Sequence, residues 1–190
     1  PKEPMAPHSL VMTMIGASLL WVGWFGFNAG SNLESNGVTA VAFVNTMVAT
    51  CAAAVSWAVV EQIHHGKASM LGAVTGAVAG LVAITPASGF VGPVGALWIG
   101  VAAGVGCFFA ATTVKRALGY DDSLDVFGVH CVGGIIGALL TGVFALKAIG
   151  GASGALEGNV GQIWTQIEGV AATLAWSGIV TLVILIVVNM

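Results

Sequence analysis

Six apolar runs, separated by short polar or glycine-rich breaks, make up the hydrophobic pattern of the chain. About 20 apolar residues, rising ~1.5 Å each, cover a hydrocarbon core of ~30 Å, so each run predicts one membrane-spanning helix. The last run is unusually long, and we expect it to tilt, curve or protrude. The predicted spans cover residues 8–30, 38–63, 70–84, 94–114, 123–146 and 161–190. The sequence thus predicts an all-α polytopic membrane protein, with six transmembrane helices in one transmembrane domain.

The composition agrees with this prediction. Hydrophobic residues make up 57% of the chain and charged residues 7%, whereas soluble domains carry about 25% charged residues. Glycine is also abundant, and small residues allow close helix approach inside lipid, where no hydrophobic force drives helices together. Gly133 and Gly137 form a GxxxG step, and Gly72, Gly76 and Gly80 follow one another at i+4 spacing. We expect close helix packing at both places.

The basic residues indicate which loops lie on which side of the membrane. With six spans, Lys2, Lys67, Lys115 and Arg116 fall on one side and Lys147 falls alone on the other. Basic loops remain in the cytoplasm. We therefore expect both termini and the loops after the second and fourth spans to be cytoplasmic. The predicted location is the inner (plasma) membrane of the cell, crossed several times.

His130 is the one ionisable side chain of consequence in the fifth run after Asp125. Lipid cannot hydrogen-bond an imidazole, so we expect a mid-span ring that faces the protein interior or a water-containing cavity. Three interpretations stay open: a bond to a neighbouring helix only, a relay for protons or cations, or a haem or metal ligand. Metal sites usually recruit several ligands, and the other histidines lie at span ends. We predict no metal site and no cofactor.

An aromatic cluster of Trp24, Phe25 and Phe27 lies near the outer end of the first span. Such rings are typical of the aromatic belt at a membrane interface. Interleaved glycines, with Asn28 and Ser31 following, favour instead a vestibule for a cation. A cation on an aromatic face gains ~2 kcal/mol when desolvated, and a hydroxyl replaces part of its water shell. Composition alone leaves both interpretations open.

Asp125 precedes His130 by five residues, which places the two on different helix faces. Its predicted role is a structural cap for the free N–H groups at the start of the span. The cysteines Cys51, Cys107 and Cys131 lie in apolar runs, and we expect them to be small buried hydrophobes. No Ser-His-Asp set, HExxH motif, nucleotide loop or basic nucleic-acid patch is present. Neither an enzyme nor a nucleic-acid-binding protein is predicted.

Several strings in the sequence resemble one family. They are WVGWFGFNAGS, AFVNT, ITPASGFVGP and DVFGVHCVGGIIG. With them the chain resembles, over essentially its whole length, the second half of the ammonium transporter (Amt/Mep/Rh) family, and its Amt branch in particular. The resemblance implies an eleven-span fold, in which spans 1–5 and 6–10 are inverted repeats around a pore and span 11 wraps the outside. The six runs would be spans 6–11.

The resemblance also implies roles for particular residues. His130 matches the second of two pore histidines, Trp24 the pore-lining tryptophan, Phe27 one ring of a phenylalanine gate, and Ser31 the hydroxyl of the outer ammonium site. The implied activity is ammonium or ammonia transport. It runs through cation recruitment at an outer aromatic vestibule, deprotonation, and passage along a hydrophobic pore with a histidine relay. The alternatives are an ammonium-sensing domain that signals to a partner, and a half-transporter that serves as a structural subunit.

The partners implied by the resemblance are ammonium or ammonia, the lipid bilayer and two further copies in a homotrimer. Spans 1–5 of the family are absent from these 190 residues. We therefore expect the missing N-terminal half to lie in the same chain or in another one. A PII-type regulator is a further implied partner, although the long cytoplasmic tail that follows span 11 in the family is absent.

Overall fold

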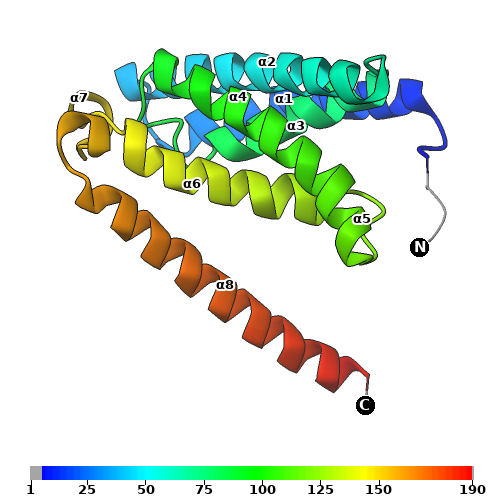
Figure 1. Cartoon of the computed structure of the whole chain (residues 1–190). Coiled ribbons are helices and arrows are strands. Elements are labelled where there is room, and N and C mark those ends of the chain that lie inside the picture. Colours follow the sequence, from blue (N-terminus) through cyan, green and yellow to red (C-terminus); the bar gives the residue numbers. More distant parts are fainter. Residues whose placement is uncertain (1–5, 190) are drawn as a thin grey trace.

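The computed structural model describes residues 6–189 and is almost wholly helical over that range (Figure 1). The long apolar helices are α1 (Leu10–Gly30), α2 (Gly37–His65), α3 (Met70–Ile84), α4 (Pro93–Phe109), α6 (Val132–Phe144) and α8 (Gly161–Val188). The shorter elements are the π turn η1 (Ala110–Val114), α5 (Lys115–Leu118), the π turn η2 (Phe127–Cys131), α7 (Lys147–Gly150) and the 3-10 turn η3 (Ala155–Glu157). By length and composition, five helical segments in the described range could cross a membrane, while α3 is shorter.

Short polar side chains set the starts of the first three helices. Ser9, Asn36 and Ser69 each stand in an extended conformation and accept hydrogen bonds from the first free N–H groups of α1, α2 and α3. Such N-caps satisfy donors that have no partner within the helix. Pro93 begins α4, where a missing N–H costs nothing. Local sequence chemistry therefore places these boundaries.

The core lies where α2, α3 and α4 pack together. Its fully buried residues are mostly small, among them Ala49, Ala83 and Ala103. A Cβ on Gly80 would lie 2.7 Å from the Ala49 carbonyl oxygen, and one on Gly137 would collide with the Ala83 carbonyl. Backbones therefore touch at these points, which confirms the close packing expected of both glycine patterns.

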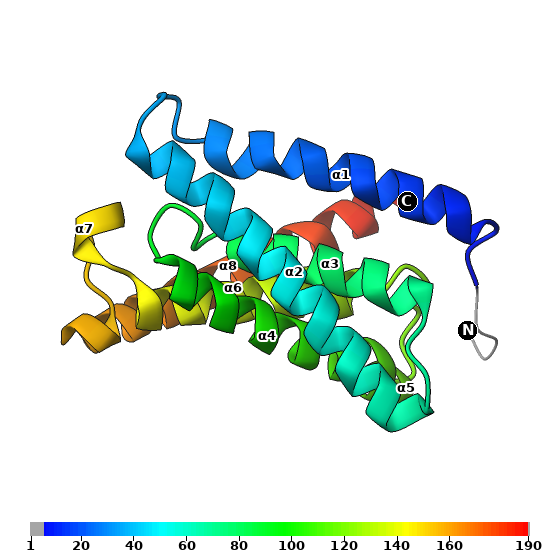
Figure 2. The same cartoon turned by 90° about the horizontal axis from the view of Figure 1, so that it is seen from above.

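The two outer helices, α1 and α8, bury little of their surface. α1 lies on one side of the bundle, where it contacts α2 and α3 and diverges from α2 away from the loop that joins them (Figure 2), and it buries only Asn28 and Ala29 among its residues. α8 buries none of its 28 residues. It meets α6 and then runs away from the bundle at an angle (Figure 1). Both helices therefore present long apolar faces that this chain does not cover.

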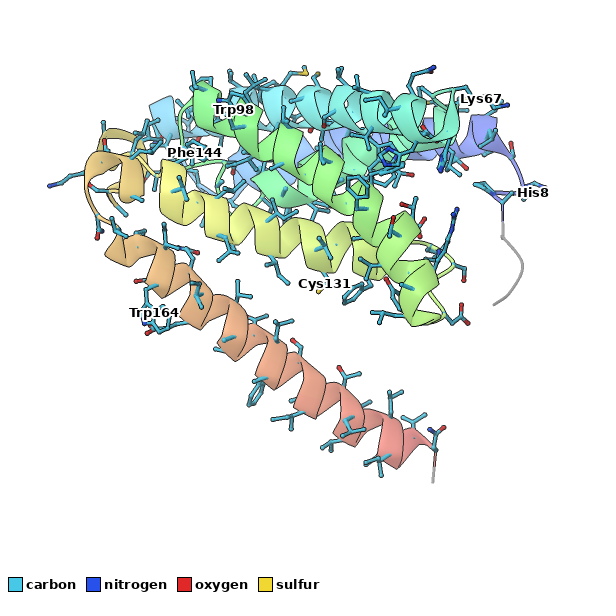
Figure 3. The ribbon with its side chains drawn as sticks, viewed as in Figure 1. His8, Lys67, Trp98, Cys131, Phe144 and Trp164 are labelled. Carbon is cyan, nitrogen blue, oxygen red and sulfur yellow. The ribbon has the colours of Figure 1, made fainter. Side chains whose placement is uncertain are left out.

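The two ends of the bundle differ in charge. The start of α1, the α2–α3 connection with Lys67, and α5 with Lys115 and Arg116 lie at one end (Figures 1 and 3). α7, which carries Lys147, lies at the other end. This is the separation expected from six alternating spans, apart from Lys2, which lies outside the described residues.

The cysteines differ in their surroundings. Cys107 is fully buried in α4, and Cys131 is partly buried. Cys51 is exposed on α2, so the expectation that it is buried is wrong for this chain. An apolar run marks a span but does not say which of its faces packs inward.

Candidate functional site

Trp24 and His130 line the same cavity. It has a volume of about 560 Å³ and lies between the ends of α1 and α3, the start of α6 and one face of α8. Most of its wall is apolar. Besides Trp24 and His130, its polar side chains include Thr85 from the end of α3 and Gln166 and Thr173 from α8. His130, which is expected to face the protein interior or a water-containing cavity, forms part of the wall of this cavity.

A hydrogen bond fixes the indole of Trp24. Its Nε1 donates to Thr85 Oγ1 at 2.8 Å, across 61 positions of sequence. The Thr85 hydroxyl in turn donates to the Leu81 carbonyl at 2.8 Å. The Thr85 hydroxyl proton is therefore donated within α3, and the Thr85 oxygen remains free to accept the hydrogen bond from Trp24. Sequence reasoning missed Thr85, which stands inside the ITPASGFVGP string without any local sign of this contact.

Phe27 and Ser31 line a second, neighbouring cavity of about 430 Å³, bounded by α1, α2, the α3–α4 loop and α7. Thr85 contributes to the walls of both cavities. The Ser31 hydroxyl donates to the Phe27 carbonyl, so its oxygen can accept a hydrogen bond from a ligand N–H group. The four residues expected to form the site therefore stand in two adjoining cavities that share one threonine.

The aromatic cluster of α1 divides into two parts. Trp24 and Phe27 meet edge to face, with ring centroids 5.9 Å apart. Phe25 instead stacks on Phe43 of α2 at 4.1 Å. The contact of Phe25 is therefore helix packing, whereas Trp24 and Phe27 line cavities.

Asn28, which follows Phe27, ties α1 to α2. Its side chain is 7% exposed, and its Nδ2 donates to Thr46 Oγ1 at 3.0 Å. A buried bond of this kind fixes the relative height of two helices, because a shift would leave the Asn28 amide without its partner, while Thr46 would keep its own bond to the Ala42 carbonyl. Asn28 thus sets the level at which Phe27 and Ser31 meet the second cavity.

His130 lies in the π turn η2, in the first turn of its helix. The expected mid-span position is therefore wrong within this helix, which begins near Phe127 and not at residue 123. The reason is local: Asp125 has a φ of 54°, a left-handed conformation that interrupts a right-handed helix. The His130 side chain is exposed within this chain, on the cavity side of the turn.

The helix cap belongs to Asp122 and not to Asp125. Asp122 Oδ1 accepts from the Val126 N–H at 2.8 Å, and its Oδ2 accepts from the Phe127 N–H at 2.9 Å. Asp125 Oδ1 instead accepts from Lys115 Nζ at 2.6 Å. The predicted cap therefore lies three positions too late in the sequence. The chain turns after Asp122, where the Asp125 N–H donates to the Asp122 carbonyl, and this turn brings the Asp122 carboxylate to the free N–H groups of the helix.

Tyr120 lies in the same loop. Burial raises the pKa of its hydroxyl, and the Asp122 carboxylate raises that pKa further.

The remaining histidines of the described region lie elsewhere. The His64 and His65 rings approach Phe108 at centroid distances of 5.5 and 5.7 Å. Among residues 6–189, no group of three or more His, Cys, Asp or Glu side chains could hold a metal ion.

Known proteins are similar to nearly the whole of this chain. The model of the Ammonium Transporter Family matches residues 1–190. The chain belongs to this family. The Ammonium transporter of Aquifex aeolicus is 52% identical over 185 residues, which cover 97% of this chain and 44% of that protein. This chain thus spans less than half the length of that relative.

Solved structures share the ammonium transporter fold. The crystal structure of Saccharomyces cerevisiae Mep2 superimposes with a TM-score of 0.92 at 36% identity, over 97% of this chain and 42% of Mep2. A solved Sensor Amt Protein superimposes with a TM-score of 0.85 at 32% identity, over 96% and 45% of the two chains. The helical fold is therefore that of part of an ammonium transporter, which is a multi-pass membrane protein and not an enzyme.

Proposed function

We propose that this chain is the second half of an ammonium transporter, spans 6–11, and that it supplies one wall of an ammonium-conducting pore. The observation that carries the proposal is the shared cavity of Trp24 and His130, joined through Thr85 to the cavity of Phe27 and Ser31. Aromatic faces, hydroxyl oxygens and an imidazole thus follow one another along an otherwise apolar path. Family membership over the whole chain supports the same substrate.

Recruitment of the cation would take place at the second cavity. Ammonium placed against the Phe27 ring, which meets Trp24 of the first cavity edge to face, gains cation–π energy, about 2 kcal/mol when it is desolvated. The Ser31 oxygen can accept a hydrogen bond from one ammonium N–H group, because the hydroxyl proton of Ser31 is already donated to the Phe27 carbonyl. This arrangement favours ammonium, which can donate a hydrogen bond to the Ser31 oxygen, over a cation of similar charge that has no N–H group.

Beyond the rings, the apolar wall of the first cavity makes a bare charge expensive. The ammonium N–H bond would break, its proton would pass to an imidazole nitrogen, and neutral ammonia would go on. His130 suits this step because its ordinary pKa lies near neutrality. The proton would then cross along the two pore histidines, of which the resemblance places the first outside this chain. Potassium carries no proton to give up and would stay excluded.

The membrane placement belongs to the same proposal. Lys67, Lys115 and Arg116 lie at one end of the bundle and Lys147 at the other. By the positive-inside rule the end with α5, and with it the C-terminus, faces the cytoplasm across the plasma membrane. The uncovered faces of α1 and α8 fit a missing N-terminal half and a homotrimer. A PII-type regulator would dock on the cytoplasmic side.

The test is the current driven by an ammonium jump across proteoliposomes that contain the full-length transporter. We expect His130→Ala to abolish or alter this current. The control is His8→Ala, at a histidine just before the start of α1, which should leave the current unchanged. Selective current of parental size from His130→Ala would remove His130 from the mechanism.

A second candidate is an ammonium sensor whose occupied state is read by a partner. It is favoured by the match to the Sensor Amt Protein. Both candidates need ammonium binding, but only the transporter needs flux. A parent protein that binds ammonium, with no current above that of empty liposomes, would decide for the sensor.

A further inference from the structure

Two π turns lie side by side, and one of them contains His130. One is η1, which continues α4, and the other is η2, which opens the His130 helix. In each, an N–H donates to the carbonyl five residues earlier: Lys115 to Ala110, and Val132 to Phe127. Each π turn holds one residue more than an α turn. One residue corresponds to about 100° of rotation about the helix axis, so the side chains after a π turn are rotated by about 100° relative to those before it. Such turns are rare and concentrate at functional sites.

The two π turns touch through their backbones. A Cβ on Gly128 in η2 would lie 2.9 Å from both the Cα and the amide nitrogen of Ala111 in η1, and 3.0 Å from its Cβ. Any side chain at position 128 would therefore push the two turns apart. Gly128 and Val129 are buried in this contact, whereas the next residue, His130, lines the cavity.

Two further contacts hold the pair of turns. Cys107 Sγ, just before η1, lies 3.8 Å from the Val129 carbonyl oxygen in η2. Lys115 Nζ, just after η1, binds Asp125 Oδ1, just before η2, at 2.6 Å. The contacts thus lie on both sides of the backbone approach, and together they fix the rotation of η2 against η1.

We propose that these opposed π turns, held by Gly128 against Ala111 and by the Lys115–Asp125 ion pair, are a positioning element that sets where the His130 imidazole stands in the cavity. The proposal rests on the role of His130 proposed above. If η2 lost its extra residue per turn, the neighbouring side chains would rotate by about 100° and the ring would leave its place. Gly128 and Lys115 act through His130 and do not themselves line the cavity.

The first variant is Gly128→Ala in the full-length transporter. We expect the ammonium-dependent current to fall at least about tenfold, because displacements near 1 Å are enough to impair chemistry. We also expect the preference for ammonium over potassium to fall. The matched control is Gly178→Ala, a helical glycine of α8 whose added Cβ meets no atom within 4 Å. The control should keep the parental current and selectivity.

Cys131 supplies a direct readout of the turn. It follows His130, is partly buried and lines the same cavity, on the side of the helix that faces α8 (Figure 3). Its labelling by a small water-soluble thiol reagent, measured by peptide mass spectrometry, reports how η2 is rotated. We expect Gly128→Ala to change the labelling rate more than about twofold, because thiol reactivity follows exposure. A merely structural loss would lower the amount of folded protein without changing this rate.

The ion pair provides a second, milder pair of variants. Lys115→Met should change Cys131 labelling and lower the current about threefold, a size suited to a partly exposed ion pair. Lys115→Arg keeps the charge and should restore both. If Gly128→Ala does not assemble, this pair decides the matter.

Parental current, selectivity and Cys131 labelling in Lys115→Met, or in a folded Gly128→Ala, would overturn the positioning role and leave the transport proposal intact. A parent protein without ammonium current would refute transport instead. In that case Cys131 labelling alone still decides whether the paired turns control the rotation of η2.

Discussion

The indole nitrogen of Trp24 and the hydroxyl oxygen of Thr85 lie 2.8 Å apart, and this bond joins the two cavities of the candidate pore. Trp24 lines the first cavity, and Thr85 lines both. The angle of the indole face, on which a cation would rest, is therefore set by a residue of another helix.

The role of Thr85 can be separated from its size. Thr85→Val keeps the shape but removes the acceptor, which leaves the Trp24 N–H without a partner at a cost of about 1–3 kcal/mol. We expect ammonium current in proteoliposomes to fall several-fold for Thr85→Val and to stay near the parental value for Thr85→Ser. Equal currents in the two variants would show that the bond does not matter for conduction.

Asn45 should be important for stability. Its side chain is fully buried in α2, and Nδ2 donates to the Ser88 carbonyl at 2.8 Å and the Val91 carbonyl at 2.7 Å. It thereby holds the α3–α4 loop, part of which walls the second cavity. Asn45→Asp keeps the shape and removes both donated bonds.

Leaving two buried carbonyls unpaired costs about 1–3 kcal/mol each. We therefore expect Asn45→Asp to lower the midpoint of thermal unfolding in detergent. Asn159→Asp is the control, because it loses a similar bond, to the Ser153 carbonyl, at an exposed site. Similar midpoints for the two variants would contradict the role assigned to Asn45.

Gly137 lies where α6 crosses α3, and an added Cβ would collide with the Ala83 carbonyl. Overpacking of this kind costs about 1–3 kcal/mol. Gly137→Ala should therefore lower thermal stability in detergent, whereas Gly16→Ala, with open space around its Cβ, should not. A Gly137→Ala protein as stable as its parent would mean that the two helices are not in backbone contact.

The membrane orientation can be tested by labelling from outside. A cysteine placed at Lys67 should react with an impermeant thiol reagent only after cells are opened, and one placed at Lys147 should react on intact cells. The physical reason is the positive-inside bias, because Lys67 lies at the basic end of the bundle. The reverse pattern would invert the proposed topology.

Much of the helical framework was predictable because its signals are local. Residues 70–84 were expected as a span, and α3 covers Met70–Ile84, since Ser69 caps its start. The helix of His130 was misplaced at its start because nothing in the sequence announces the left-handed conformation of Asp125. An aspartate tolerates this conformation, but the sequence does not say which aspartate adopts it.

The sequence nominates residues for the candidate site, but it does not predict the contacts between them. Trp24, Phe27, Ser31 and His130 stand along two joined cavities. The contact of Trp24 with Thr85 spans 61 positions, and only the fold brings the two together. Phe25, which the sequence groups with Trp24, stacks on Phe43 because it lies on another face of α1.

The sparse packing of α8 bears on how the protein is made. The helix meets the rest of this chain mainly through α6 near one end, yet it is the most apolar of the five long helical segments in the described range. Integration of this segment by the translocon can therefore rest on its own affinity for hydrocarbon more than on contacts with the other helices described here. A charge introduced late in α8 would be expected to cause failed insertion, visible as a longer stretch open to protease, well before it changed any melting curve.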